Sequence, residues 1–183
     1  MIANLSLRAN ANNEFIDPTK RTLLLQIEST PGIRHRELLR TTKFSNGVMT
    51  YHISALEKLN MINIDRRKNN KSTRYYTVNI PQEEAKIIGY VRNSVNRNII
   101  KYILDNELCT FSEIRDHIKK APSTISWHLK RLNIAGVILI IQGVDSNLYR
   151  ISDSERVAKI LHKYKDSFMD RVVDNYTELI TEL

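Results

Sequence analysis

The sequence predicts a mainly α-helical α+β protein with small β-hairpins, in which two tandem copies of one unit precede a long C-terminal helix. Three observations support this prediction. The chain repeats itself at a distance of 76 residues, each copy combines helical apolar spacing with two short β-like stretches, and residues 153–183 carry one apolar stripe. The 183 residues suit one ordinary domain or two small ones, and the 42% apolar content is sufficient for packed cores.

The internal repeat aligns residues 21–64 with residues 97–140 without a gap. Identical pairs in this alignment include Arg21 with Arg97, Ile27 with Ile103, Glu37 with Glu113, His52 with His128, and Leu56 with Leu132. Many other pairs are apolar in both copies, and Tyr51 aligns with Trp127. The repeat therefore predicts an N-terminal extension (1–16), a first domain (17–80), a second domain (81–152) and a C-terminal helix (153–183).

The first copy is expected to form three helices and a hairpin. Asp17 is a candidate N-cap with Pro18 at the first helical position. Short apolar runs around residues 37–39 indicate a second helix, and Ser45-Asn46-Gly47 is expected to be a turn before a third helix at 48–59. Residues 61–64 and 74–78 have the composition of two paired strands.

The second copy repeats this order with a longer first helix, expected at residues 84–105. Thr110 and Glu113 have the spacing of a capping box and are expected to start the second helix. Pro122 is expected to start the third helix, and Ala135-Gly136 to end it. Residues 137–141 and 148–151 then form the predicted hairpin.

The C-terminal segment is predicted to be one amphipathic helix from Ser154. Its apolar residues recur at intervals of three and four, close to a heptad pattern. A helix of this kind after two complete domains is expected to pair with a second chain, so a homodimer is predicted. Packing of the stripe on the protein's own core is the alternative. The predicted dimerisation residues are Leu161, Tyr164, Phe168, Val172, Tyr176 and Leu179.

The formal net charge of +8 is concentrated in the repeat. Residues 17–80 contain 12 Lys/Arg and 5 Asp/Glu, residues 92–152 contain 9 and 5, and residues 153–183 contain 5 and 7. A basic body with a slightly acidic tail favours a polyanionic partner, most often nucleic acid, although a merely solvated basic surface gives the same numbers.

The segment 121–138, with its Ser-Thr-Ile-Ser-Trp-His-Leu core and the later Ala-Gly pair, resembles the recognition helix and first wing strand of winged helix-turn-helix regulators. The similarity is to the ArsR/MarR-like branch common in archaea and bacteria. The segment 46–62 is a looser copy, with Asn60 in place of Gly136. The resemblance implies two tandem winged helix-turn-helix domains and an archaeal-type transcription regulator that binds double-stranded DNA.

In such a protein the third helix of each unit would enter the major groove with its N-terminal residues leading. The face opposite the apolar stripe would then meet DNA, through side chains that reach bases or phosphates. In the first unit these are Asn46, Thr50, Tyr51 and Ser54, with Lys58 a further candidate; in the second they are Ser123, Thr124, Ser126, Trp127, Lys130 and Arg131. Packing of Tyr51 and Trp127 against the second helix is the alternative for the two aromatic residues.

The two hairpins differ in charge. The first is strongly basic and would grip backbone phosphates or place an arginine in a minor groove, unless it is only a solvated charge run. Its residues are Arg66, Arg67, Lys68, Lys71 and Arg74. The second hairpin turn, 143–147, is shorter and contains Asp145, so we expect it to add little to phosphate binding.

No metal site or cofactor is predicted. The single cysteine, Cys109, is expected to be a small buried hydrophobe, and the five histidines form no close-spaced ligand pair. His52 and His128 occupy equivalent positions, where a hydrogen bond between helices is the expected role, ahead of pH sensing or a DNA contact.

Other function classes fit the sequence less well. An enzyme is not expected, because the chain has no Gly-rich phosphate loop and no nucleophile motif. A nucleoid-coating protein and a tandem winged-helix protein-interaction subunit stay open as alternatives to a sequence-specific regulator. No segment has the length of a membrane span or the pattern of a signal peptide, so a cytoplasmic, nucleoid-associated protein is expected, with its small-molecule effector and operator unknown.

Overall fold

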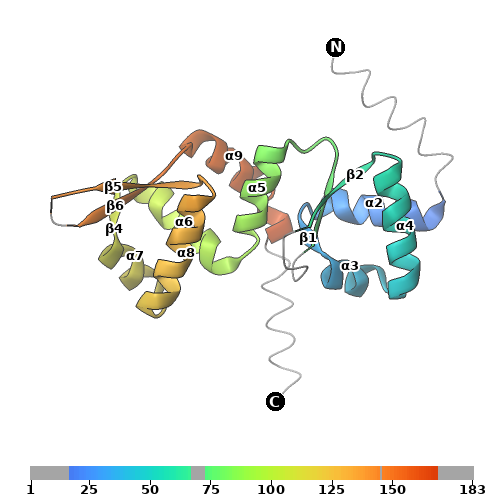
Figure 1. Ribbon diagram of the computed structural model, residues 1–183, viewed down its shortest axis with the longest axis horizontal. Coiled ribbons are helices and arrows are strands. Elements are labelled where there is room, and N and C mark those ends of the chain that lie inside the picture. Colours follow the sequence, from blue (N-terminus) through green and yellow to red (C-terminus); the bar gives the residue numbers. More distant parts are fainter. Residues whose placement is uncertain (1–16, 67–72, 145, 169–183) are drawn as a thin grey trace, which may run out of the picture. The chain divides into compact units, whose positions relative to one another are not determined.

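The computed structural model describes residues 17–66, 73–144 and 146–168. The chain divides into two compact units, Met1–Pro81 and Gln82–Leu183, here called unit 1 and unit 2 (Figure 1). Both units combine helices with one small antiparallel sheet, which confirms the predicted α+β class. No helix among the described residues is long and apolar enough to cross a membrane.

Unit 1 contains three helices and a three-stranded sheet in the order β1-β3-β2. Its elements are α2 (Pro18–Ser29), β1 (Ile33–Arg34), α3 (His35–Thr42), α4 (Asn46–Lys58), β2 (Ile62–Asp65) and β3 (Arg74–Thr77). The strand β3 lies between its two partners, with Tyr75 opposite Ile33 on one side and Ile64 on the other.

The helices of unit 1 start where side chains satisfy free backbone N–H groups. The Asp17 carboxylate accepts hydrogen bonds from the N–H groups of Thr19 (2.8 Å) and Lys20 (3.2 Å), as predicted for an N-cap. Ser45 caps α4 by accepting from the Val48 N–H at 3.3 Å. Because of this cap, Asn46 and Gly47 belong to the helix, so the prediction that they form a turn with Ser45 is wrong.

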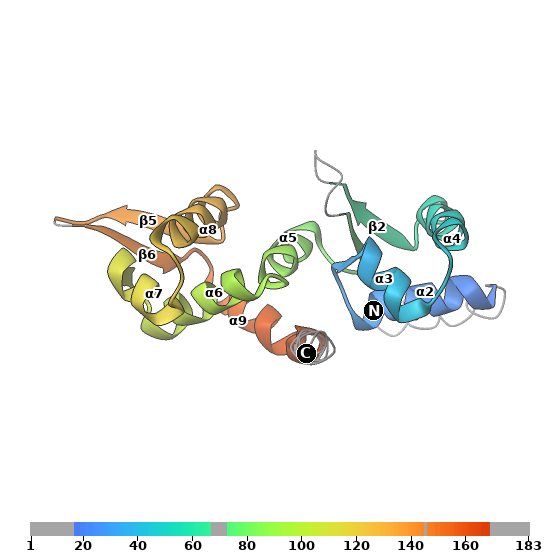
Figure 2. The ribbon, with the colours of Figure 1, turned by 90° about the horizontal axis from the view of Figure 1, so that it is seen from below.

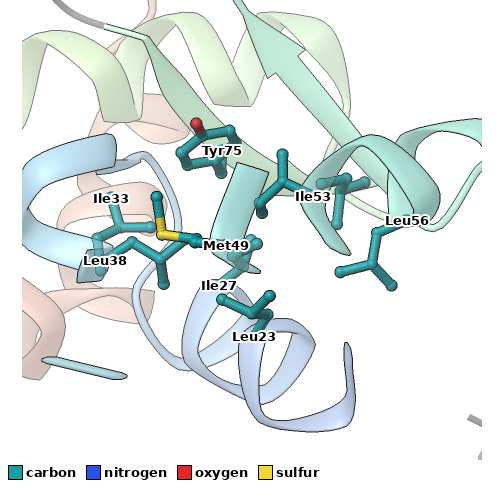
Figure 3. Close-up of a cluster of buried hydrophobic side chains, with 9 residues drawn as sticks. Leu23, Ile27, Ile33, Leu38, Met49, Ile53, Leu56 and Tyr75 are labelled. Carbon is teal, nitrogen blue, oxygen red and sulfur yellow. The ribbon is translucent and has the colours of Figure 1, made fainter. Parts of the chain in front are cut away.

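The core of unit 1 is formed where α2, α3 and α4 meet the sheet (Figure 3). Met49, Ile53 and Leu56 of α4 provide its central stripe, spaced at i, i+4 and i+7. The remaining buried members are Leu23, Ile27, Ile33, Leu38, Ile62 and Tyr75. Burial of this stripe fixes which side of α4 faces outward.

Unit 2 has the same succession of elements, with one additional helix at each end. Its elements are α5 (Gln82–Val91), α6 (Ser94–Asn106), β4 (Cys109–Thr110), α7 (Phe111–Ile118), α8 (Pro122–Ile134), β5 (Ile138–Gln142), β6 (Asn147–Ile151) and α9 (Ser154–Lys163). The sheet order β4-β6-β5 matches that of unit 1. The predicted capping box is confirmed, because Thr110 and Glu113 bond each other's backbone N–H groups.

The prediction of one long helix at residues 84–105 is wrong. Two helices, α5 and α6, are separated at Arg92 and Asn93. The Asn93 side chain accepts from the Asn96 N–H at 3.0 Å and so starts a new helix, while the Arg97 guanidinium donates to the Val91 carbonyl at 2.9 Å and satisfies the end of α5.

Both sheets contain a third, two-residue strand that the sequence did not indicate. These strands, β1 and β4, are too short to show any alternation of side chains, and each forms by pairing with the last strand of its unit. Each hairpin therefore supplies two strands of a three-stranded sheet.

The repeat extends to backbone conformation. Lys43 and Lys119 end the second helices with positive φ angles of 57° and 54°. Asn60 (φ 53°) and Gly136 (φ 71°) both follow the third helix in the left-handed region. Asparagine tolerates this conformation better than most side chains, which explains how Asn60 replaces the glycine of the second copy.

The predicted C-terminal helix forms within the described residues, but it is interrupted at Tyr164 and so is not continuous. Helix α9 ends at Lys163, and its C-cap Tyr164 departs from helical geometry with φ −111° and ψ 18°. Residues 165–168 are helical again, and this segment brings Ser167 and Phe168 onto the buried Arg92. The Arg92 guanidinium donates to the Ser167 carbonyl at 2.7 Å and lies 5.2 Å from the centre of the Phe168 ring.

This arrangement corrects the set of predicted dimerisation residues. Phe168 is only 3% exposed and belongs to the core of its own unit. Leu161 and Tyr164 are half-buried, and the Tyr164 hydroxyl lies 3.4 Å from a Glu84 carboxylate oxygen of the same unit. Val172, Tyr176 and Leu179 lie outside the described residues.

A pair of leucines at the end of α4 tests the core. Leu56 is fully buried, whereas Leu59 is 59% exposed. We expect Leu56→Ala to lower the free energy of unfolding by about 2–5 kcal/mol, because it leaves a cavity among packed side chains. Leu59→Ala is the matched control and is expected to change it by less than about 1 kcal/mol. Chemical denaturation measures both, and equal losses would contradict the assigned burial.

Candidate nucleic-acid interface

The outward face of α4 carries the four predicted binding residues of unit 1. Asn46, Thr50, Tyr51 and Ser54 are all exposed, and Tyr51 leaves 70% of its surface to solvent. The stripe of Met49, Ile53 and Leu56 faces the core, so the polar side chains share the opposite side of the helix.

Helix α8 repeats this division in unit 2. Its buried residues include Ile125, Leu129 and Leu132, at the same spacing as in α4. Of the predicted binding residues, four are exposed and two are half-buried. The exposed ones are Ser123, Ser126, Trp127 and Lys130, and the half-buried ones are Thr124 and Arg131. Trp127 is 53% exposed.

Each outward face carries an aromatic side chain set edge-on against the following histidine. The ring centres of Tyr51 and His52 lie 5.1 Å apart at 83°, and those of Trp127 and His128 lie 4.8 Å apart at 87°. The Arg131 guanidinium lies 4.5 Å from the centre of the Trp127 ring, a cation–π contact. These contacts hold each aromatic ring over its own helix, with much of its surface free.

His128 connects α8 to α6. Its Nδ1 atom lies 2.6 Å from Asn96 Oδ1, and its side chain is buried, which confirms the predicted link between helices. Burial, and secondarily the charge of Arg131, lowers the pKa of His128, so the imidazole is neutral near pH 7 and Nδ1–H donates to Asn96. The equivalent His52 lies 3.8 Å from an Asp17 carboxylate oxygen.

Arg66, directly after β2 in the first hairpin, is bonded to Glu57 near the end of α4. Arg66 forms two hydrogen bonds of 2.6 Å with the Glu57 carboxylate in a bidentate ion pair. This pair lowers the pKa of Glu57 and raises that of Arg66. The ion pair thus gives Arg66 a role in positioning the hairpin, and its predicted contact with phosphate stays a prediction.

One predicted phosphate-binding residue is wrongly assigned. Arg74 is only 3% exposed, and its Nη1 atom donates to the Gly32 carbonyl at 2.7 Å. The guanidinium therefore ties β3 to the loop before β1 and is withheld from solvent. Arg67, Lys68 and Lys71, the other basic residues predicted here, lie outside the described residues.

The second hairpin, β5–β6, has an apolar surface that the sequence reasoning missed. Figure 2 shows it extending away from the helices of unit 2. Leu139, Ile140 and Ile141 on β5 are each more than a third exposed, and Val144 at the turn is fully exposed. The signal was the uncharged run 137–144, which had been interpreted only as a strand (137–141) and the start of a turn.

A polar link at the start of α4 was likewise missed. His35 Nδ1 lies 2.7 Å from the Tyr75 hydroxyl, and His35 Nε2 lies 2.8 Å from Asn46 Oδ1. The three residues come from α3, β3 and α4, so no local spacing in the sequence brings them together.

Within the described ranges, no cluster of three or more His, Cys, Asp or Glu side chains has the arrangement of a metal site. Cys109 is buried in β4, as predicted, and burial raises the pKa of its thiol. The predicted binding residues that are exposed on α4 and α8 carry hydroxyl, amide, aromatic and basic groups.

Residues 93–138, from the N-cap of α6 to the first residue of β5, match the family described as "Bacterial regulatory protein, arsR family". Unit 2 contains an ArsR-family helix-turn-helix domain. The match includes all of α8, so the ArsR-family domain contains the outward face described above.

The chain is also similar to an uncharacterized HTH-type transcriptional regulator of Methanocaldococcus jannaschii. The two are 23% identical over 139 residues, which is 76% of this chain and 34% of the relative. The chain thus spans about a third of that relative's length. The family and this relative are both named as regulators, in agreement with the expectation that the chain is not an enzyme.

Two solved structures resemble parts of the chain. HlyU from Vibrio cholerae has a TM-score of 0.41 and 20% identity, covering 45% of this chain and 89% of its own. A homodimeric winged helix-turn-helix DNA-binding domain from Mycobacterium bovis, a possible ArsR-family regulator, has a TM-score of 0.39 and 16% identity, covering 52% and 82%.

The lowered pKa of His128 gives the ArsR-family domain a pH-dependent stability. A group whose pKa is depressed by folding stabilises the fold above its unfolded value, about 6.5 for histidine, and loses that contribution as the pH falls through its folded pKa. As the pH is lowered from about 7.5 to about 5.5, we expect the midpoint of thermal unfolding to decrease in the wild type. The decrease should be smaller in His128→Gln, because glutamine takes up no proton in this range.

The matched control is His117→Gln, at an exposed histidine of the same unit. This variant should show the wild-type pH dependence. A His128→Gln midpoint that falls as steeply as that of the wild type would contradict the assignment.

Proposed function

We propose that the protein is a sequence-specific transcription regulator that binds double-stranded DNA with the third helix of both units. The observation that carries this proposal is the repeated outward face of α4 and α8. Each buries one apolar stripe and turns hydroxyl and aromatic groups outward, and α4 adds the amide of Asn46. One α-helix fits the major groove, where such groups reach base edges and phosphates.

Charge supports duplex DNA as the partner. Lys130 and Arg131 follow the hydroxyl side chains at the start of α8, in the position from which cations contact backbone phosphates. In unit 1 the basic residues of the hairpin, Arg67, Lys68 and Lys71, would provide most of the electrostatic attraction. Such a protein would act in the cytoplasm, at the nucleoid.

The two units would contribute differently. Unit 1 joins a basic hairpin to its recognition helix, whereas the hairpin of unit 2 presents Leu139, Ile140 and Ile141. An exposed apolar strand at a sheet edge favours contact with protein. A protein-interaction role for this hairpin is therefore a second candidate function, and it is compatible with DNA binding through α8.

We also propose a homodimer formed through the C-terminal residues beyond Phe168. Val172, Tyr176 and Leu179 continue the apolar spacing that led to this expectation. A two-fold dimer would favour an inverted-repeat binding site.

Selection from a random pool of duplexes, followed by affinity measurements at several salt concentrations, tests DNA binding. We expect one recovered motif and an affinity that falls steeply with salt. Lys130→Gln should reduce the slope of log affinity against log salt by about 1, since one phosphate contact is lost. The control Lys86→Gln removes the same charge from an exposed site on α5 and should leave the slope unchanged.

Three results would contradict parts of this proposal. Salt-dependent binding without a motif would indicate a DNA-coating protein. The absence of binding at modest salt would favour the protein-interaction class. Equal effects of Lys130→Gln and Lys86→Gln would remove α8 from the interface.

Charged substitutions on the C-terminal stripe test the dimer. Val172→Asp combined with Leu179→Asp in the full chain should convert a dimer to a monomer, because two carboxylates would face an apolar contact. The control Thr177→Asp with Thr181→Asp adds the same charge away from the stripe. Light scattering measures the mass, and a dimer in the doubly substituted stripe variant would exclude this interface.

A further inference from the structure

The polar link between His35, Tyr75 and Asn46 determines which way an outward-facing amide is oriented. His35 is the first residue of α3, and Asn46 is the first residue of α4, the leading end of the proposed recognition helix. The imidazole bridges the Tyr75 hydroxyl at 2.7 Å and Asn46 Oδ1 at 2.8 Å. The side chain of Asn46 itself is exposed.

The proton positions in this link follow from the burial of Tyr75. Tyr75 is 3% exposed, and burial raises the pKa of its hydroxyl to about 12, so the phenol keeps its proton. A buried hydroxyl proton needs an acceptor, and among the described residues His35 Nδ1 is the one within hydrogen-bond distance. Tyr75 therefore donates to Nδ1.

The hydrogen bond from Tyr75 to Nδ1 determines the direction of the second hydrogen bond, between His35 and Asn46. A neutral imidazole that accepts at Nδ1 carries its proton on Nε2, and Nε2–H then donates to Asn46 Oδ1. The amide oxygen of Asn46 is held toward His35, and its NH₂ group is left to face outward as a hydrogen-bond donor.

We propose that His35 and Tyr75 orient Asn46 as a dedicated hydrogen-bond donor, which makes Asn46 select guanine over adenine at one position of the DNA site. Guanine presents two acceptors, O6 and N7, in the major groove, whereas adenine presents the acceptor N7 and the donor N6. An asparagine that reads adenine directs its oxygen at N6–H, and here that oxygen is turned toward His35, away from the position that N6 would take. This inference rests on the proposed DNA-binding function and specifies it.

Unit 2 indicates that the link is not a requirement of the fold. Phe111 is the first residue of α7 and corresponds to His35, and Pro122 is the first residue of α8 and corresponds to Asn46. Tyr149 corresponds to Tyr75, because each pairs with the first residue of the short strand. The same succession of elements forms in unit 2 with apolar residues at the positions of His35 and Asn46. Folding therefore does not explain why unit 1 has a polar pair there.

The first experiment examines the link without DNA. In the full chain, long-range ¹H–¹⁵N spectra distinguish the two neutral imidazole tautomers, and His35→Phe identifies the His35 signals by their loss. We expect the Nε2–H tautomer at about pH 7.5, and Tyr75→Phe should abolish the preference. A predominant Nδ1–H tautomer in the wild type would overturn the proposal, whether or not the protein binds DNA.

The second experiment compares the DNA motifs selected by the wild type, His35→Phe and Asn46→Ala. His35→Phe introduces the residue that unit 2 carries and releases the amide of Asn46. We expect one guanine of the wild-type motif to lose its preference over adenine by about 5-fold or more in both variants, while the affinity for non-specific duplex changes by less than about 2-fold. The matched control His117→Phe replaces an exposed histidine that stacks on Tyr102 and should select the wild-type motif.

The outcomes separate this inference from the function on which it rests. If the wild type yields no motif, the proposed function fails, and the role of Asn46 in base reading fails with it. If the wild type yields a motif that His35→Phe leaves unchanged, the regulator function stands and the orienting role of His35 is excluded. A position that changes in Asn46→Ala but prefers adenine in the wild type would also exclude it. Thermal unfolding of each variant verifies that the compared proteins are folded.

Discussion

Burial of one apolar stripe on the third helix is the constraint on which the rest of each unit depends. In α4 the stripe is Met49, Ile53 and Leu56, and in α8 its counterparts are Ile125, Leu129 and Leu132. At 3.6 residues per turn, residues at i, i+4 and i+7 occupy one side of a helix. The exposed residues between them, among them Tyr51 and Trp127, are therefore directed outward. The candidate interface is thus a direct consequence of core packing, and it stays in place as long as the stripe is buried.

The two units share one backbone arrangement and differ in their surface side chains. Second and third helices end in the same left-handed conformations, even where Asn60 takes the place of Gly136. The units differ in two features. Unit 1 has the polar residues His35 and Asn46 where unit 2 has Phe111 and Pro122, and the hairpin of unit 1 is basic whereas that of unit 2 is apolar. Divergence at such positions leaves the core untouched, so each unit is free to acquire its own binding properties.

Features that depend on local spacing were predictable, and features that depend on distant contacts were not. The caps at Asp17 and Thr110 and the outward faces of α4 and α8 follow from residues within one or two turns of a helix. Arg74 was misassigned because charge alone does not reveal that the Gly32 carbonyl, 42 positions earlier, receives its guanidinium. Phe168 fits a helical stripe equally well whether a partner or Arg92 covers it. The break at Asn93 was a local signal, a capping residue inside an apolar pattern, that the longer periodicity obscured.

The buried thiol of Cys109 has a practical consequence for spectroscopy on this molecule. Maleimide and iodoacetamide reagents attack thiolates that solvent reaches, and Cys109 meets neither condition, being 1% exposed with a raised pKa. A cysteine placed at an exposed position such as Ser126 or Ser54 would therefore take up a fluorophore or spin label selectively, with the native residue left in place. Distances and label environments at the outward faces of α4 and α8 thereby become accessible in the otherwise unaltered protein.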